Sequence, residues 1–373
     1  MKKILFLLII ILIFSFPISV SAYDPTTMPN NIYGISVINH SDLPDVSRLV
    51  NTGGGDWGYV TVVMTEKGIN REVWQKFMDD CTRLHLIPIV RIATKFSEDS
   101  WEIPKVEDID SWINFFNSLN WVTENRYIII GNEPNHAKEW GGIINPSEYA
   151  IYLKTFAERL HNASPLYFVL NAGFDQDAPN SKGTLRDKNT MDEKKFIELM
   201  QKEIPDIFEF IDGWSSHSYP NPAFSGSKLG IGRRSIRGYE WELGIIKKEL
   251  PIFITETGWT RGGNSEKVIG DSMKYAYENI WSKDKRIVAV TPFILNYQQE
   301  PFFDFSWKKS DTDFFPVYSE IQSINKIAGI PVLSVIEEPE SEIKIPNIHP
   351  NIYAYIFNNR IQENHGTISP WMN

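Results

Sequence analysis

The chain of 373 residues carries 37 basic and 47 acidic side chains, and its formal net charge of −10 argues against nucleic acid as a partner. Hydrophobic residues make up 42% of the sequence, enough for a large core, and the aromatic share of 13% is high for packing alone. The only cysteine, Cys81, excludes an internal disulfide. Its apolar neighbours recur at helical spacing, so we expect a buried core residue rather than a nucleophile.

The N-terminus has the pattern of a secretory signal peptide. Lys2 and Lys3 precede an almost entirely apolar run of 13 residues, Ile4 to Phe16, and small residues at 20 and 22 suit cleavage after Ala22. A retained membrane anchor is the alternative, but crossing a bilayer takes about 20 apolar residues. We therefore expect residues 1–22 to direct export, and the mature protein to be secreted or located at the cell surface.

Short β-branched and aromatic runs alternate with amphipathic stretches along the rest of the chain. Apolar residues recur three and four positions apart in the stretches between the runs, which predicts helices. Eight runs have the length and composition of strands: Ile32 to Ile38, Tyr59 to Met64, Ile87 to Ile92, Tyr127 to Gly131, Tyr167 to Asn171, Gly213 to His217, Ile252 to Glu256 and Val288 to Leu295. The clearest helices are Glu72 to Leu84, Ser111 to Leu119, Ser147 to Leu160 and Lys267 to Trp281.

Eight strands that alternate with helices predict an α/β protein, a (β/α)8 TIM barrel over residues 23–328. A doubly wound open sheet is the alternative, and it would need a glycine-rich phosphate turn after the first strand. The chain has Asn39-His40-Ser41 there instead. Residues 329–373 contain several prolines and an acidic stretch, and they predict a C-terminal tail too short for a typical accessory domain.

Two of the eight strand patterns end in a glutamate. The fourth runs into Asn132-Glu133-Pro134, and the seventh ends at Glu256. A carboxylate at the end of an apolar strand indicates a functional role, because burying an isolated charge is costly. In a barrel the C-terminal strand ends face a common mouth, where Glu133 and Glu256 can act as the carboxyl pair of a glycosidase.

Both motifs together resemble those of glycoside hydrolase clan A, with barrels of family 39 and family 5 as the similar types. The motifs are Gly-Asn-Glu-Pro-Asn at 131 to 135 and Ile-Thr-Glu-Thr-Gly-Trp at 254 to 259. The resemblance implies a retaining glycosidase with Glu133 as acid/base and Glu256 as nucleophile. It also implies that Asn132 hydrogen-bonds the sugar 2-hydroxyl, although Asn132 can instead be a plain turn residue.

Further side chains near the strand ends are candidates for substrate binding. His217 and Tyr219 follow the sixth strand and can donate hydrogen bonds that keep Glu256 ionised, although a histidine at a strand end is often only structural. Arg91 shares parity with Ile89 and can point into the barrel, with a surface salt bridge as the alternative. Aromatic residues in the rim loops are candidate sugar platforms, some of which core packing can explain instead: Trp140, Trp259, Tyr297 and Trp307. Relatives commonly place a tryptophan at the end of the eighth strand, where this chain has Tyr297 nearby.

The sequence predicts neither a metal centre nor a cofactor site, since the seven histidines are scattered and only His217 stands at a strand end. We expect a monomer whose partner is a carbohydrate substrate. The non-enzymatic alternative is a catalytically weak carbohydrate-binding barrel or a surface scaffold. Loss of either glutamate would have favoured it, and both glutamates are present.

Overall fold

The computed structural model describes residues 21–181 and 189–335. The described residues up to Ser334 form one compact unit. Most of the predicted signal segment and most of the predicted tail lie outside the described residues. Within the described ranges, no helix is both long and apolar enough to span a bilayer.

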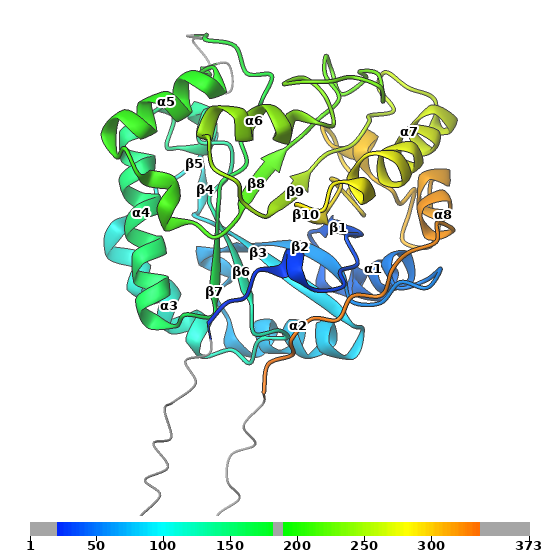
Figure 1. Ribbon diagram of the computed structural model, residues 1–373, viewed down its shortest axis with the longest axis horizontal. Helices are drawn as coiled ribbons and strands as arrows, with labels where there is room; N and C mark the ends of the chain where they lie inside the picture. Colours follow the sequence, from blue (N-terminus) through cyan, green and yellow to red (C-terminus); the bar gives the residue numbers. More distant parts are fainter. Residues whose placement is uncertain (1–20, 182–188, 336–373) are drawn as a thin grey trace, which may run out of the picture. The chain divides into compact units, whose positions relative to one another are not determined.

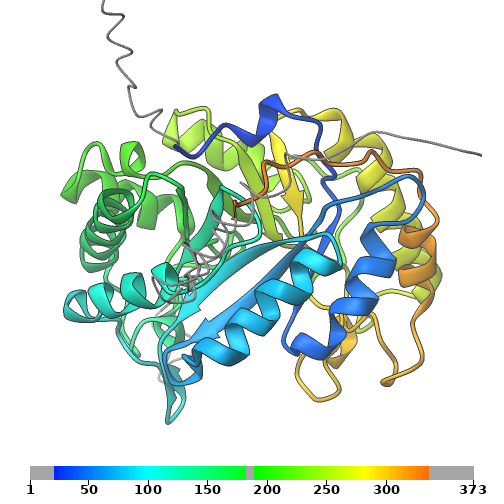
Figure 2. The same cartoon turned by 90° about the horizontal axis from the view of Figure 1, so that it is seen from below.

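The expected alternation of strands and helices is confirmed. The parallel strands are β1 (Gly34–Val37), β2 (Gly58–Thr65), β3 (Leu86–Ala93), β6 (Arg126–Ile130), β7 (Tyr167–Asn171), β8 (Trp214–His217), β9 (Ile252–Glu256) and β10 (Ile287–Val290). One helix follows each strand and covers it from outside (Figures 1 and 2). These helices are α1 (Leu43–Val50), α2 (Arg71–Arg83), α3 (Ile109–Asn117), α4 (Pro146–Ala163), α5 (Glu193–Glu203), α6 (Gly238–Ile246), α7 (Glu266–Asn279) and α8 (Pro316–Gln322).

The last strand is shorter than the sequence predicts. We expected it to reach Leu295, but β10 ends at Val290. Pro292 has no N–H to continue a ladder. The chain beyond β10 nevertheless stays beside its neighbours, because Ser36 N–H donates to the Pro292 carbonyl at 3.0 Å and Phe293 N–H donates to the Thr257 carbonyl at 3.0 Å.

Backbone ladders divide the strands into two parallel sheets, ordered β1-β2-β3-β6-β7 and β10-β9-β8. Isolated parallel bridges join the sheets at the two seams, Leu170 to Gly213 and Asp175 to His217 on one side and Tyr33 to Val290 on the other. At the first seam the Asn171 side chain adds to the backbone pairing. Asn171 accepts from Ser215 N–H at 2.9 Å and donates to the Ser215 carbonyl at 3.1 Å. The described chain is therefore an α/β fold whose strands follow barrel order, and isolated bridges with a few backbone hydrogen bonds connect the two sheets at the seams.

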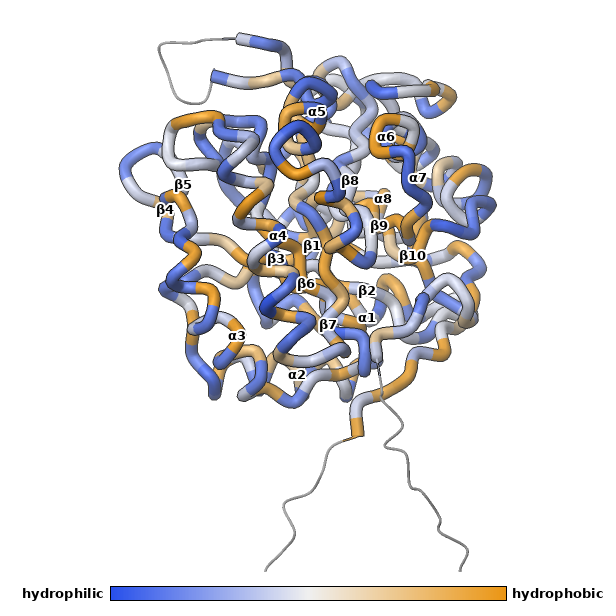
Figure 3. Tube along the Cα trace, turned by 60° about the vertical axis from the view of Figure 1, so that its left-hand side comes forward, coloured by the Kyte–Doolittle hydropathy of each residue, from blue (hydrophilic) through white to orange (hydrophobic). Residues whose placement is uncertain are grey.

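Two layers of apolar side chains explain the near-continuous apolar strands. The larger cluster lies between strands and helices, and it includes Cys81, which is fully buried as predicted. A smaller cluster fills the space enclosed by the strands, with Ile87, Ile89 and Tyr127 among its members. Because side chains alternate along a strand, Arg91 follows Ile87 and Ile89 on the inner face. Figure 3 shows hydrophobic residues recurring along the central strands, while hydrophilic ones alternate with them on the helices.

The four expected helices are present within a few residues of their predicted bounds. Helix α4 begins as its sequence predicts, since the Asn145 side chain accepts from Glu148 N–H at 3.2 Å and Pro146 occupies the first turn. A small hairpin, β4 (Phe96–Ser97) with β5 (Ser100–Trp101), was not predicted. It places Trp101 in the loop after β3.

Residues 329–335, the described start of the predicted tail, form backbone hydrogen bonds with the compact unit. Ile330 N–H donates to the Pro29 carbonyl at 2.9 Å, and Glu124 N–H donates to the Val332 carbonyl at 2.9 Å. The compact unit accordingly extends to Ser334, beyond the boundary that we expected at 328.

Helices α5 and α6 bury a pair of carboxyl groups between them. Glu193 and Glu242 are fully buried, and none of their four oxygens has a hydrogen-bond partner among the described residues. Burial raises the pKa of Glu193 well above its ordinary value, and the neighbouring Glu242 raises this pKa further. Folding thus favours the protonated form of Glu193.

We expect Glu193→Gln to stabilise the protein at neutral and alkaline pH. The unfolded chain ionises Glu193 near 4.5, so the stability that this group contributes is full below that pH and is lost as pH rises toward its raised folded-state pKa. Glutamine is neutral throughout this pH range, so its burial does not become less favourable as the pH rises. The melting temperature, followed by calorimetry from pH 4 to pH 9, should rise by about 2 to 4 °C for each kcal/mol recovered. Glu198→Gln on the exposed side of α5 is the control, and a lower melting temperature of Glu193→Gln at alkaline pH would contradict the prediction.

Candidate active site

One glutamate follows β6 and the other ends β9, so both lie at C-terminal strand ends. After β6 the chain turns sharply, with Gly131 at φ +93° and Glu133 at φ +31°. The turn is held because Glu133 N–H donates to the Gly173 carbonyl at 2.9 Å. Glu256 is the last residue of β9. Both side chains are partly shielded, with 23% and 17% of their surfaces exposed for Glu133 and Glu256, so each carboxylate faces both protein and solvent.

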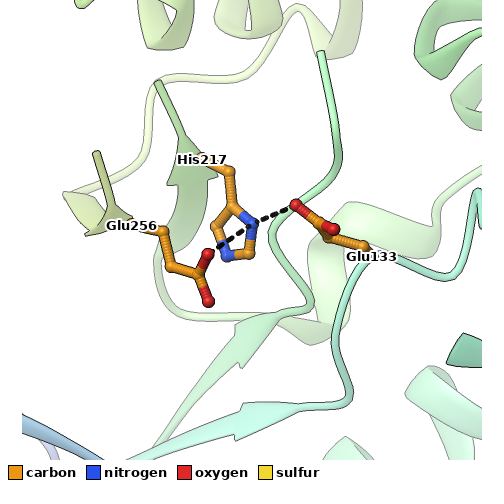
Figure 4. A group of neighbouring side chains, drawn as sticks. All are labelled: Glu133, His217 and Glu256. Atoms are coloured by element: carbon orange, nitrogen blue, oxygen red, sulfur yellow. Dashed lines mark hydrogen bonds and ion pairs between the residues drawn. The ribbon is translucent and has the colours of Figure 1, made fainter. Parts of the chain in front are cut away.

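His217, at the end of β8, lies between the two carboxylates (Figure 4). Its Nδ1 is 2.8 Å from Glu133 Oε1 and 3.7 Å from Glu256 Oε2. One oxygen of each glutamate and one ring nitrogen of His217 lie within 4.8 Å of one another. We expected His217 to serve Glu256, but its hydrogen bond goes to Glu133. Burial lowers the pKa of His217, but the charges of Glu256 and Glu133 outweigh it and leave the pKa raised.

Tyr219 and Arg91 both reach Glu256. The Tyr219 hydroxyl donates to Glu256 Oε2 at 3.1 Å, the contact that the sequence predicts. Burial and the charges of Glu256 and Glu133 raise the pKa of Tyr219 well above its usual value, so the phenol keeps its proton. Arg91 Nη1 lies 3.4 Å from Glu256 Oε1, and its side chain is 16% exposed. Arg91 therefore points into the site and does not form a surface salt bridge.

Asn132 links Arg91 to a carboxyl group that the sequence analysis missed. Its side-chain oxygen accepts from Arg91 Nη1, and its amide donates to Glu139 Oε2 at 3.2 Å. Glu139 ends a short 3-10 helix, Ala137–Glu139, in the loop after β6. Burial and the charge of Glu133 raise the pKa of Glu139 to about 7, so this group titrates near neutrality.

His136 and Asp175 form a pair of ionisable groups near Glu133 that the sequence did not predict. His136 Nε2 is 2.7 Å from Asp175 Oδ2. Burial lowers the pKa of His136, but the Asp175 hydrogen bond and the charge of Glu133 raise it to about 8 overall. His136 N–H also donates to the Glu133 carbonyl at 2.8 Å. The sequence signal for both missed groups is their position, because His136 and Glu139 follow Glu133 by three and six residues in one βα loop.

A cavity of about 340 Å³ opens beside Glu256. Arg91 and His217 contribute to its wall, and so does Tyr297, as the sequence predicts. Three further aromatic side chains line it that were not expected as binding residues: Trp101, Phe293 and Phe302. Phe293 and Tyr297 follow β10 in the chain.

Three predicted sugar platforms are wrong, because these rings are buried. Trp140, Trp259 and Trp307 are exposed by only 2%, 3% and 4%. Trp140 packs edge-on against Tyr149 of α4, and the Trp259 indole donates to the Gly226 carbonyl at 2.8 Å. The loops that carry them fold back onto the protein, so none offers an open face to a sugar ring.

Glu133, His217 and Glu256 are also spaced as a metal-binding group would be. A divalent cation at Glu256 would meet the Arg91 guanidinium on the same carboxylate. That positive charge disfavours a dication there. The arrangement fits a pair of carboxyl groups in acid/base or nucleophilic roles better than a set of metal ligands.

No family model and no curated protein matches this chain in sequence. Solved structures are similar in fold. An endo-β-1,4-glucanase from Xanthomonas axonopodis pv. citri is 12% identical, with 78% of this chain and 98% of that chain covered and a TM-score of 0.53. A glucosidase from Croceicoccus marinus is 10% identical, with 81% and 68% covered and a TM-score of 0.57. XacCel5A in complex with cellopentaose is 12% identical, with 79% and 98% covered and a TM-score of 0.51.

At these identities the likeness concerns the fold alone. The chain shares the α/β fold of alternating parallel strands and helices with these glycoside hydrolases.

Proposed function

We propose that this protein is a clan A-type glycoside hydrolase that cleaves O-glycosidic bonds of a poly- or oligosaccharide with retention of configuration. Glu133 acts as acid/base and Glu256 as nucleophile. Similarity to family 5 has support from the fold of XacCel5A and the glucanase, and similarity to family 39 rests on the sequence motifs. In this proposal the two sheets close into a (β/α)8 barrel through their seams.

The separation of the two carboxylates carries the proposal. Retaining enzymes hold their carboxyl groups about 5 to 5.5 Å apart, whereas inverting enzymes leave about 6.5 to 9.5 Å for a water molecule. One oxygen of Glu133 and one oxygen of Glu256 lie within 4.8 Å of each other. This spacing supports direct attack by Glu256 on the anomeric carbon.

The surroundings of each carboxylate suit its proposed role. Glu256 accepts from Tyr219 and faces Arg91, so both neighbours stabilise its charged form as a nucleophile needs. When His217 carries its proton on Nδ1, it donates to Glu133 Oε1. The other oxygen of Glu133 is then free to carry the proton for the leaving group and later to take a proton from water.

Export completes the proposal. The signal-peptide pattern of residues 1–22 supports a secreted or cell-surface enzyme, where polymeric carbohydrate is accessible to it.

The test is release of reducing ends from a panel of polysaccharides and oligosaccharides by the purified mature protein. We expect Glu133→Gln to reduce turnover by about 10²- to 10⁴-fold, the usual worth of general acid catalysis, and Glu256→Gln to reduce it at least as much. Glu249→Gln, whose side chain is 78% exposed at the opposite ends of the strands, should leave turnover unchanged. Carbohydrate binding without turnover in the wild type would instead favour the carbohydrate-binding barrel or scaffold.

A further inference from the structure

The cavity beside Glu256 has an apolar inner wall. Across β2, β3 and β6 the register places Val63 next to Arg91 and Arg91 next to Ile129. All three side chains line the cavity. Arg91 is turned toward Glu256 and Asn132, so the flanking valine and isoleucine present only methyl and methylene groups to an occupant.

Three hydroxyl groups that line the cavity, those of Ser36, Thr61 and Thr255, are already hydrogen-bonded within the protein. Ser36 donates to the Thr291 carbonyl at 3.3 Å, and Thr61 pairs with the Thr291 hydroxyl at 2.8 Å. Thr255 pairs with the Ser215 hydroxyl at 2.6 Å. Among the described lining residues outside the catalytic group, this leaves the hydroxyls of Thr65 and Tyr297 and the indole N–H of Trp101 as donors for a ligand.

The position of the cavity identifies which part of a substrate would fill it. Glu256 lines the cavity, whereas Glu133 is absent from the described lining. In a retaining glycosidase the acid meets the leaving group and the nucleophile meets the anomeric carbon of the sugar that stays bound. The occupant is therefore the sugar on the nucleophile side of the scissile bond.

We propose that the sugar bound against Glu256 presents an apolar substituent where common hexoses present a free hydroxyl, as a 6-deoxyhexose does. The inference rests on the proposed function and specifies its substrate class. A hydroxyl buried against Val63 and Ile129 would lose its hydrogen bonds to water and find no replacement, whereas a methyl group loses nothing there.

The experiment measures binding of matched methyl glycosides to the wild-type protein by calorimetric titration, in both anomeric forms. Each pair differs only at C6: fucoside against galactoside, and rhamnoside against mannoside. An apolar pocket discriminates against an added hydroxyl by about 10- to 100-fold, and we expect that preference for the deoxy member in the pair that fits. Equal or tighter binding of the hydroxylated member, or no binding of either member of both pairs, overturns the proposal.

Val63→Thr tests the wall itself, because it exchanges a methyl group for a hydroxyl at nearly constant volume. We expect it to reduce the deoxy preference several-fold, and Ile38→Thr at the cavity rim to act in the same direction. Val73→Thr, half exposed on α2, is the matched control and should keep the wild-type ratio. An unchanged ratio in both cavity variants, with folding intact, contradicts the proposal. Failure of the proposed function appears separately, as undiminished turnover in the glutamate variants.

Discussion

Glu256→Gly is expected to lose hydrolysis by about 10⁴- to 10⁶-fold, the range seen when a residue essential to covalent catalysis is removed. Azide should restore turnover of an activated aryl glycoside, because a small anion can occupy the vacated space and attack the anomeric carbon directly. A single displacement inverts configuration. The product should be a glycosyl azide whose anomeric configuration is opposite to that of the substrate, as determined by NMR.

Glu133→Gly provides the complementary control. An activated leaving group needs little protonation, so this variant should still form the glycosyl-enzyme, and azide should then release a product of retained configuration. If azide gave a retained product with the Glu256 variant, or an inverted one with the Glu133 variant, the two roles would have to be exchanged.

Arg91→Leu is expected to lower kcat by about 10²- to 10³-fold, similar to the loss of one donor that stabilises charge in a transition state. One guanidinium nitrogen contacts both Glu256 and Asn132. The substitution therefore removes this contact from the proposed nucleophile and from the side chain that is predicted to bind the sugar 2-hydroxyl. KM should change less than kcat. Steady-state kinetics on the best substrate of the panel measures both.

Arg91→Lys separates charge from geometry. Lysine keeps the positive charge but lacks the planar fork, so we expect it to recover part of kcat while Asn132 remains poorly held. Wild-type kcat in Arg91→Leu would show that Arg91 only supports the fold.

The sequence was most informative where chemistry coincides with strand periodicity. Glu133 and Glu256 were found because a carboxylate at the end of an apolar strand conflicts with burial, and Arg91 was found because it shares parity with Ile89. The tryptophan platforms failed for the opposite reason. A loop position at the rim does not determine whether a ring faces solvent or folds back, as Trp140 does against Tyr149.

The hydrogen bond of His217 also lay beyond sequence reasoning. Chain order places it next to Glu256, on the strand beside β9, but its ring nitrogen bonds Glu133 across the mouth. The difference depends on the turn after β6, where a left-handed backbone brings Glu133 toward β8. Such a turn follows from contacts such as that with the Gly173 carbonyl, not from local composition.

The division of the strands into two ladders assigns one glutamate to each. Glu133 follows β6 of the five-stranded sheet, and Glu256 ends β9 of the three-stranded sheet. The bonds from His217 to Glu133 and from Arg91 to Glu256 both span the two halves. Any opening along a seam therefore changes the distance between the Glu133 and Glu256 carboxylates, between which the glycosidic oxygen must fit. A sugar that contacts both sheets should hold them together. Ligand binding should accordingly slow amide exchange at Gly213 and Val290, far more than at the centre of either ladder.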